Sequence, residues 1–560
     1  MGRTLLCVSI MVQDAESALS TAIEARDAGA DLIELRLDQV AAQDIADGSV
    51  RSIRALIGDV PLPCVVTCRP VREGGAYQGG DDVRIEFLRA VCQPDSFDEC
   101  HPPAFVDIEL STIESNADCA KRLTTFVRAP GDDCDSRPRL IVSHHDYQGR
   151  PGKLFDRLHA LRSVSSAAAL KLAWAARSLR DNLEIFEILM EKDRPTIALV
   201  MGEQGVMSRV LAAKFGAFLT FATTSGGAAT APGQPTIREL LDLYHLRSMK
   251  RSTEVYGIVG WPVGHSLSPL VHNAGFEAIE RDAVYVPMPI RPDWESFKAT
   301  VLSMLEFTAL DLRGLSVTAP HKQHLVRLAT KDQTRFWHIS SLVAHIGAAN
   351  TLIVDDNGAC ELLNTDAMAI ASIGTDFAQL HGRACSEIHV AIAGAGGAAR
   401  AAAAALVGLG MHVTVCARNV ERAVRLVEAV QAADSVQLGD RQRISAQPWD
   451  WMSTSLCEMY INATPIGMQG SQNPDATGIP LKDIAPRTND TGGIAVFDMV
   501  YSPLCTPLLR EAKRLGMIQI DGATMFVQQA AAQFRAWTGC KAPLGLFDRL
   551  VRETLTGVEA

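Results

Sequence analysis

The first part of the chain, to about residue 245, alternates short apolar runs with amphipathic stretches, and this alternation restricts the fold more than any other feature. Each run has the length and composition of a buried strand, and most are followed by a segment with helical periodicity. The predicted strands are Thr4–Val12, Asp31–Asp38, Leu62–Arg69, Ala104–Leu110, Arg139–Asp146, Ala167–Trp174, Thr196–Gly202 and Phe218–Thr223. Eight strand-then-helix units predict a (β/α)8 barrel, which typically needs ~250 residues.

The second half also alternates strands with helices, and it contains one phosphate-binding signature. Residues 389–410 form an apolar strand, a glycine-rich turn and an alanine-rich helix, and a second strand-like run, HVTVCAR, follows. Within the turn, Gly394, Gly396 and Ala399 fit the pattern G-x-G-x-x-A. This order predicts the first βαβ unit of a Rossmann domain that binds a dinucleotide.

Composition and charge exclude several classes of function. The net charge of −11 argues against nucleic acid or an anionic membrane surface as a partner. Residues 401–417, the longest apolar stretch, contain two Gly and a His, so no membrane span is expected. Thirteen Cys without zinc-ligand spacing predict reduced thiols and no metal site. Because a strand begins at Thr4, we expect no targeting segment, and hence a cytoplasmic protein or a processed plastid form.

Charged residues lie at the ends of several predicted barrel strands. Glu34, Arg36 and Asp38 fall on one face of their strand, and taken alone they fit a half-solvated strand equally well. In a barrel, however, charges at the carboxyl end of a strand point into the mouth of the active site. Arg69 and His145 end two further strands and are therefore candidates for the same site.

Lys171 lies in the middle of a predicted strand, between Ala169 and Ala173 on the inward face. Small neighbours leave room for a ligand, and burial disfavours the charged form of a lysine. The neutral amine is the form that Schiff-base chemistry requires. The alternative is a lysine that extends to solvent from an exposed strand, which the alanine neighbours and the barrel position disfavour.

Six ordered motifs in this half, ELRLD, TCRPVREGG, VSHHDY, LKLAW, MGEQGVMSR and ATAPGQ, resemble type I 3-dehydroquinate dehydratase. The resemblance implies that Lys171 forms an imine with the C3 ketone of 3-dehydroquinate. It implies that His145 is the general base and acid, oriented by Glu73. The implied substrate contacts are Arg209, Thr230 and Gln234 at the carboxylate, and Ser9, Glu34, Arg36 and Arg69 on the hydroxyl side.

Polar residues of the second half cluster at strand–helix junctions. Ser266 and Ser268 flank a turn into a helix, where a helix N-cap is the simpler explanation. Lys322 and Asp366 form a plausible proton-transfer pair, although a structural salt bridge would have the same sequence pattern.

With GAGGAAR, NATPIGM, FDMVYSPLCTPLL and DGATMFVQQAAAQF, these segments are similar to shikimate dehydrogenase over residues 255–560. The resemblance implies that Lys322 and Asp366 pass a proton to the C3 alkoxide as NADPH delivers hydride. The implied shikimate contacts are Ser266, Ser268, Thr318, Asn350, Asp366, Tyr501 and Gln529. The implied NADP contacts are Gly394, Ala395, Gly396, Gly397, Ala398, Arg418, Asn419, Arg422, Met499 and Gly522.

One segment departs from the family pattern. The family usually has Asn-Arg-Thr after the second strand of the nucleotide domain, where this chain has Ala417-Arg418-Asn419. The Arg is retained, and no acidic residue stands there to pair with a ribose 2′-hydroxyl. This favours NADP over NAD.

The order of the halves resembles the plant-type bifunctional dehydratase–dehydrogenases, which implies small-molecule substrates and leaves the oligomeric state open, a monomer included. The expected architecture is a barrel over 1–247, a linker over 248–254, a shikimate-binding α/β domain over 255–380 completed by helices in 524–560, and a Rossmann domain over 381–523. Two alternatives differ in function: a quinate dehydrogenase in the second half, and a quinate-sensing regulator derived from these enzymes. The regulator is disfavoured because Lys171, His145, Lys322 and Asp366 are all present.

Overall fold

The computed structural model describes residues 3–43, 47–93, 102–115, 117–128, 136–224, 233–432, 440–487 and 493–557. The chain divides into two compact units. The first comprises Met1–Glu254 with Val286–Ile290 and Ala299–Asp311, and the second comprises Val255–Tyr285, Arg291–Lys298 and Leu312–Ala560. Within these described ranges, no helix is both long and apolar enough to cross a membrane.

The first unit contains the eight predicted strands, all parallel to their neighbours. They are β1 Leu5–Met11, β2 Leu32–Arg36, β3 Cys64–Thr67, β4 Phe105–Glu109, β5 Arg139–Asp146, β6 Ala167–Ala175, β7 Thr196–Met201 and β8 Leu219–Ala222. Their order is β7-β6-β5-β4-β3-β2-β1-β8. The amide of Phe218 donates to the carbonyl of Thr196 at 2.8 Å, which brings β8 back to β7 and nearly closes the barrel.

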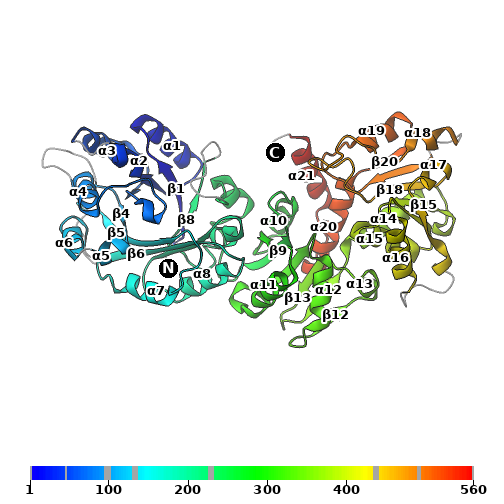
Figure 1. Ribbon diagram of the computed structural model, residues 1–560, viewed down its shortest axis with the longest axis horizontal. Helices are drawn as coiled ribbons and strands as arrows, with labels where there is room; N and C mark the ends of the chain where they lie inside the picture. The colour runs from blue at the N-terminus through cyan, green and yellow to red at the C-terminus, as the bar shows by residue number, and fades with distance from the viewer. Residues whose placement is uncertain are drawn as a thin grey trace. The chain divides into compact units, whose positions relative to one another are not determined.

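Helices surround this barrel, as the blue and cyan part of Figure 1 shows. The longer ones are α1 Ala15–Asp27, α3 Asp47–Asp59, α4 Asp81–Cys92, α6 Ala117–Phe126, α7 Leu154–Ser163 and α8 Asp181–Met190. Shorter ones are α2 Asp38–Gln43, α5 Leu110–Ser115 and α9 Val206–Val210, followed by a π-helical turn, Glu239–Leu243. Ala169 and Ala173 of β6 belong to the apolar cluster inside the barrel. Because side chains alternate along a strand, Lys171 between them points inward as well.

The segment predicted as a linker is hydrogen-bonded to the barrel. The buried Lys214 donates through Nζ to the carbonyls of Arg251 at 2.7 Å and Thr253 at 2.8 Å. Strand β9, Glu254–Gly260, begins at the last residue of this segment. Two backbone carbonyls of the segment are thus held at the barrel, because a buried ammonium needs several oxygen acceptors.

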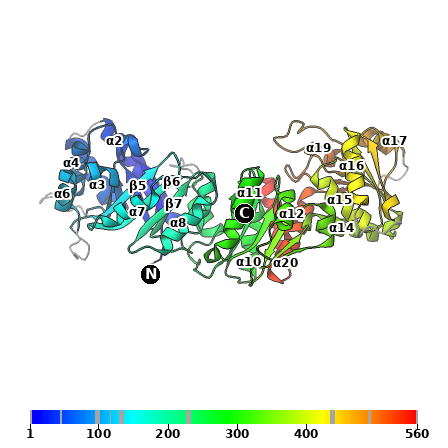
Figure 2. The same cartoon turned by 60° about the horizontal axis from the view of Figure 1, so that its bottom comes forward.

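A six-stranded mixed sheet opens the second half, in the order β10-β9-β11-β13-β14-β12. The further strands are β10 Ala283–Pro289, β11 Leu312–Val317, β12 Trp337–Ile339, β13 Thr351–Val354 and β14 Cys360–Leu363. The associated helices are α10 Ser268–Ala278, α11 Trp294–Glu306, α12 Lys322–Lys331, α13 Ser341–Ile346, α20 Gly522–Thr538 and α21 Leu544–Thr556. Figures 1 and 2 both show α20 beside α10. Phe276 of α10, Phe534 of α20 and Phe547 of α21 share one apolar core.

A second six-stranded sheet is entirely parallel and has the order β17-β16-β15-β18-β19-β20. Its strands are β15 His389–Ala393, β16 His412–Ala417, β17 Ile444–Pro448, β18 Met459–Asn462, β19 Ala495–Asp498 and β20 Ile518–Ile520. The helices are α14 Thr365–Leu380, α15 Gly397–Gly408, α16 Val420–Gln431, α17 Trp451–Thr454, α18 Leu481–Ile484 and α19 Pro507–Arg514. Counted from β15, the order is 3-2-1-4-5-6, which confirms the predicted Rossmann fold.

Candidate active sites

Lys171 is buried inside the barrel and paired with two carboxylates. Its Nζ lies 2.7 Å from Oε1 of Glu34 on β2 and 3.0 Å from Oδ2 of Asp107 on β4. The side chain is 6% exposed, and Nζ is 4.8 Å from the centre of the Phe221 ring. The surroundings of Lys171 thus differ from the small apolar neighbours expected from its strand, because two carboxylates contact its nitrogen.

Both carboxylates remain ionised in this enclosed site. Burial works to raise the pKa of Glu34, but Lys171 and Arg69 together lower it below its ordinary value. Burial acts in the same direction on Asp107, and Lys171, Arg69 and His145 outweigh it, so that the pKa of Asp107 falls well below its usual range. The hydroxyl of Ser9 donates to Oε2 of Glu34 at 2.7 Å.

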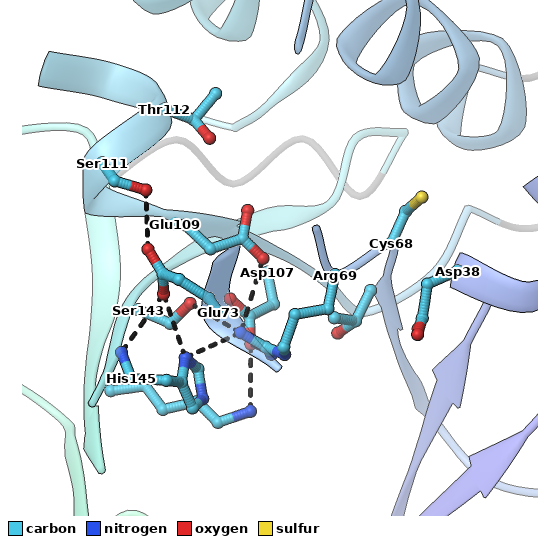
Figure 3. Close-up of polar contacts among 12 residues, drawn as sticks. Asp38, Cys68, Arg69, Glu73, Asp107, Glu109, Ser111, Thr112, Ser143 and His145 are labelled. Atoms are coloured by element: carbon cyan, nitrogen blue, oxygen red, sulfur yellow. Dashed lines mark hydrogen bonds and ion pairs between the residues drawn. The ribbon is translucent and has the colours of Figure 1, made fainter. Parts of the chain in front are cut away.

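Arg69 follows β3 and connects Asp107, Glu109 and His145. Its Nη2 donates to Oδ2 of Asp107 at 2.9 Å, and its Nη1 lies 3.4 Å from Oε1 of Glu109 (Figure 3). Nη1 also lies 2.7 Å from Nδ1 of His145. Burial works to lower the pKa of Arg69, but Asp107 and Glu109 raise it above its ordinary value. A guanidinium only donates, so Nδ1 is the acceptor and the ring proton of neutral His145 lies on Nε2.

Glu73 lies between Ser111 and His145 (Figure 3). It ends a 3-10 turn, Val71–Glu73, that follows β3. Its Oε2 accepts from the amide of His145 at 3.2 Å and lies 3.3 Å from Nδ1, and its Oε1 accepts from the Ser111 hydroxyl at 2.6 Å. Burial, and then the charge of Glu109, raise the pKa of Glu73 to about 7. Burial, Arg69 and Lys171 hold the pKa of His145 well below its ordinary value.

The remaining predicted dehydroquinate contacts differ in their surroundings. Arg36 makes a two-pronged ion pair with Asp38, at 2.8 and 3.0 Å. Arg209 on α9 is 2% exposed, and its Nε has no hydrogen-bond partner among the described residues. Burial lowers the pKa of Arg209 to about 10. Gln234 donates through Nε2 to the carbonyl of Ala222 at 2.9 Å, and Thr230 lies outside the described residues.

Sequence reasoning missed several polar residues of this site. Asp107 and Glu109 on β4 contact Lys171 and Arg69, and Glu109 also accepts from Arg84 Nη1 at 2.6 Å. A signal was present, because the run FVDIE places two acids with the same i, i+2 spacing as Glu34 and Arg36. Ser111, two residues after Glu109, carries no comparable signal in the sequence.

The second site is a cavity of about 240 Å³ in the second unit. Lys322 is the first residue of α12, and Asp366 is in the first turn of α14. The distance from Lys322 Nζ to Asp366 Oδ2 is 2.6 Å. The predicted residues that line the cavity are Ser268, Thr318, Lys322, Asn350, Asp366, Tyr501 and Gln529, with Ala398, Met499 and Gly522 from the predicted cofactor set. Ser266 is not among the lining residues; its hydroxyl accepts from the amide of Ser268 at 3.2 Å, as in a helix cap.

Hydrogen bonds hold the residues that line or adjoin this cavity in place. The side chain of Asn364 caps α14 by accepting from the amide of Ala367 at 3.0 Å. Tyr285 donates to the Ser316 hydroxyl at 2.6 Å, and Ser316 donates to Oε1 of Gln533 at 2.9 Å. Ser316 and Gln533 line the cavity, and neither was singled out from the sequence. Their partners are far apart in the chain, so no local pattern marks them.

A separate cavity lies where the Rossmann strand order reverses, beyond the ends of β15 and β18. Its lining includes Gly394, Ala395, Gly396, Arg418, Asn419 and Arg422. Gly394 has φ +119°, and a Cβ there would lie 3.0 Å from the Ala463 carbonyl. At Gly396 and Gly397 a Cβ would meet no atom within 4 Å, so the turn leaves open space before the amino end of α15. These features fit a bound pyrophosphate.

Three profiles of known families match the chain: type I 3-dehydroquinase over residues 6–251, the shikimate dehydrogenase substrate binding domain over residues 258–352, and the shikimate 5′-dehydrogenase C-terminal domain over residues 522–552. The chain is 33% identical over 556 residues to the chloroplastic bifunctional 3-dehydroquinate dehydratase/shikimate dehydrogenase of Arabidopsis thaliana, covering 97% of this chain and 83% of the relative.

Two further proteins resemble the chain. The shikimate dehydrogenase (NADP(+)) of Methanocella arvoryzae is 36% identical over 308 residues, which is 54% of this chain and 99% of the relative. Among solved structures, the dehydroquinate dehydratase and shikimate dehydrogenase from S. pombe is 24% identical, with 98% of both chains covered and a TM-score of 0.41.

Proposed function

Since the chain belongs to the family of bifunctional 3-dehydroquinate dehydratase/shikimate dehydrogenases, we propose which of its residues carry out each reaction. The protein dehydrates 3-dehydroquinate to 3-dehydroshikimate and reduces this product to shikimate with NADPH. The observation that carries the residue assignment is Lys171, a lysine buried inside the barrel and paired with two carboxylates.

In the dehydratase, Lys171 is the nucleophile that forms an imine with the C3 ketone. The imine withdraws electrons from C2, whose proton passes to His145, and His145 then protonates the departing C1 hydroxyl. Glu73 stabilises the imidazolium that exists between these steps, because its Oε2 lies 3.3 Å from Nδ1. Arg69 donates to Nδ1 at 2.7 Å through Nη1, so this one contact must break before Nδ1 carries a proton.

Arg209 binds the substrate carboxylate. Its buried Nε has no partner among the described residues, and a buried guanidinium N–H without an acceptor is costly unless an anion binds to it. Gln234 and Thr230 are proposed as further carboxylate contacts on the resemblance to the family alone. Ser9, Glu34 and Arg36 contact the ring hydroxyls, and the hydrogen bond from Ser9 to Glu34 orients that carboxylate.

Lys171 is tested by trapping the imine. We expect borohydride with 3-dehydroquinate to inactivate dehydration and to leave a covalent adduct on the peptide that contains Lys171. The Lys171→Ala variant should lose dehydration by several orders of magnitude, as expected when a covalent nucleophile is deleted. Shikimate oxidation by the same variant is the control for folding. Fully inactivated protein with an unmodified Lys171 would refute the assignment.

In the dehydrogenase, Lys322 and Asp366 transfer the proton at the C3 oxygen. Their 2.6 Å contact in the wall of the cavity supports this pair. Ser268, Thr318, Asn350, Tyr501 and Gln529 line the same cavity and bind the substrate, and the Ser266 hydroxyl orients Ser268. NADPH, when bound, supplies the hydride.

Arg418 recognises the 2′-phosphate of NADP. It is exposed, and it lines the cavity beside the glycine-rich turn. A guanidinium–phosphate pair contributes about 1.5–3 kcal/mol, so Arg418→Ala should raise the KM for NADP⁺ about tenfold to a hundredfold. The KM for NAD⁺ should change little. Arg425→Ala is the matched control, because Arg425 lies exposed on the same helix, α16, but does not line this cavity. A wild type that prefers NAD⁺ would contradict the assignment.

We also propose the domain boundaries predicted from the sequence, small-molecule substrates with no nucleic acid or membrane as a partner, and a reducing compartment such as the cytoplasm or a plastid stroma. The ten cysteines whose side chains the structure describes are free, which supports such a compartment. The net charge of −11 supports the absence of a nucleic-acid partner.

A further inference from the structure

Asp107, on strand β4 of the barrel, contacts the side-chain nitrogen of Lys171. Its side chain is fully buried, and its Oδ2 lies 3.0 Å from Lys171 Nζ and 2.9 Å from Arg69 Nη2. Arg69 and Lys171 thus contact the same oxygen of this carboxylate. The motifs that identify the family and the roles proposed above leave Asp107 without a function.

The charge on the lysine nitrogen survives the covalent step. Imine formation joins Nζ to C3 and expels the carbonyl oxygen as water. The three hydrogens of the ammonium become one N–H of the iminium and two of the water, and one positive charge stays on nitrogen. A carboxylate that pairs with the ammonium can therefore pair with the iminium, and only the protonated imine withdraws electrons strongly from C2.

We propose that Asp107 is the counter-ion of the protonated imine, which it keeps charged through the dehydration. This inference rests on the proposed imine at Lys171. Among the described residues, the groups that interact with this nitrogen or with its two carboxylates are Cys7 from β1, Glu34 and Arg36 from β2, Arg69 after β3, Asp107 from β4, His145 from β5 and the Phe221 ring from β8. The two acids among them are Glu34 and Asp107.

Both carboxylates are ionised, and it is the contacts of Asp107 that favour it over Glu34 in this role. Asp107 is held by Arg69 and is closed to solvent, so it keeps its place when the substrate enters. Glu34 is 4% exposed and is oriented by the Ser9 hydroxyl, as suits a group that binds a substrate hydroxyl.

The test measures the pH at which the imine loses its proton in the full-length protein. The imine is formed with 3-dehydroshikimate, and its rate of reduction by cyanoborohydride, which reduces protonated imines far faster than neutral ones, is followed against pH. An opposite charge at this distance shifts such a midpoint by about one to three pH units. In Asp107→Asn the midpoint should therefore fall by that amount, and kcat for dehydration should fall at least about tenfold at neutral pH with KM little changed.

Glu109→Gln is the matched control. Glu109 is on the same strand, is equally buried and also contacts Arg69, at 3.4 Å, but it is not among the residues that contact Lys171. Its substitution should leave the midpoint in place. A folded Asp107→Asn with an unchanged midpoint, or a larger downward shift in Glu34→Gln, would overturn the inference. Shikimate oxidation by each variant reports whether the chain has folded.

The wild type offers a test that needs no variant. Its imine should stay protonated to a pH about one to three units above that of the imine formed by a free lysine derivative and the same ketone. Equal midpoints would refute Asp107 as counter-ion even if Asp107→Asn does not fold. The absence of any adduct on Lys171 would instead refute the proposed function, so the two failures are distinguishable.

Discussion

At the scale of single residues, Glu73 and His145 contact each other in the dehydratase site, and their pKa values are shifted in opposite directions. Burial and Glu109 raise the pKa of Glu73 to about 7, whereas burial and two cations hold the pKa of His145 well below its ordinary value. From weakly acidic to neutral pH, His145 is therefore neutral and Glu73 is the group that changes charge. Groups whose environments push their pKa values apart are typical of acid–base catalysis.

This separation predicts an acidic limb in the dehydratase pH profile. Above pH 7 Glu73 is ionised and stabilises the imidazolium of His145, and below it Glu73 is protonated and neutral. The kcat/KM for 3-dehydroquinate, which reports groups of the free enzyme, should fall as the pH drops through about 7. Glu73→Gln should remove the limb and lower the plateau about tenfold to a hundredfold, the value of one charge-assisted hydrogen bond.

Ser111 supplies the companion measurement. Its hydroxyl donates to Glu73 and lowers the pKa of that carboxyl, so Ser111→Ala should move the limb to higher pH. The two variants must agree for Glu73 to be the titrating group. A limb that persists in Glu73→Gln would assign it to another residue.

At the scale of elements, the turn between β15 and α15 requires glycine at one position. Gly394 has φ +119°, and a Cβ there would lie 3.0 Å from both the Ala463 carbonyl and Cγ2 of Thr464. Alanine in such a sparsely populated backbone region costs about 1–3 kcal/mol and would displace the turn. Gly394→Ala should raise the KM for NADP⁺ at least about tenfold and leave dehydration unchanged.

Gly408, at the other end of α15, is the control for this prediction. A Cβ at Gly408 would meet nothing within 4 Å, and alanine favours a helix over glycine by about 0.5–1 kcal/mol. Gly408→Ala should keep the wild-type KM and should not lower Tm. If Gly394→Ala also keeps the wild-type KM, the turn does not approach the pyrophosphate closely.

At the scale of the whole molecule, each reaction has its residues within one compact unit. The described dehydratase residues belong to the first unit, and the cavity with Lys322 and Asp366 belongs to the second. Two inactivated chains should therefore complement each other. An equimolar mixture of Lys171→Ala and Lys322→Ala should convert 3-dehydroquinate to shikimate, measured by NADPH loss and product analysis.

Each variant alone defines the baseline for this mixture. Lys171→Ala should consume NADPH with 3-dehydroshikimate but not with 3-dehydroquinate, and Lys322→Ala should accumulate 3-dehydroshikimate. A mixture that stays inactive, although each variant keeps its own half-reaction, would show that the intermediate is not released to solution.

The sequence alone determined the strands, the two folds and the order of the domains along the chain. Both signals are local. The two-residue alternation of side chains follows from the geometry of a strand, and the glycine-rich turn follows from the positive φ that glycine tolerates. For this reason the inward direction of Lys171 could be predicted from Ala169 and Ala173.

Only the tertiary structure decided which charges meet. Lys171 contacts Glu34 and Asp107, which lie 137 and 64 residues away along the chain. These contacts depend on barrel curvature and on the register of neighbouring strands, which no local pattern encodes. Tertiary structure likewise places Ser268, and not Ser266, in the wall of the second cavity. It also explains why Lys171 lies between two carboxylates, a setting that its alanine neighbours could not predict.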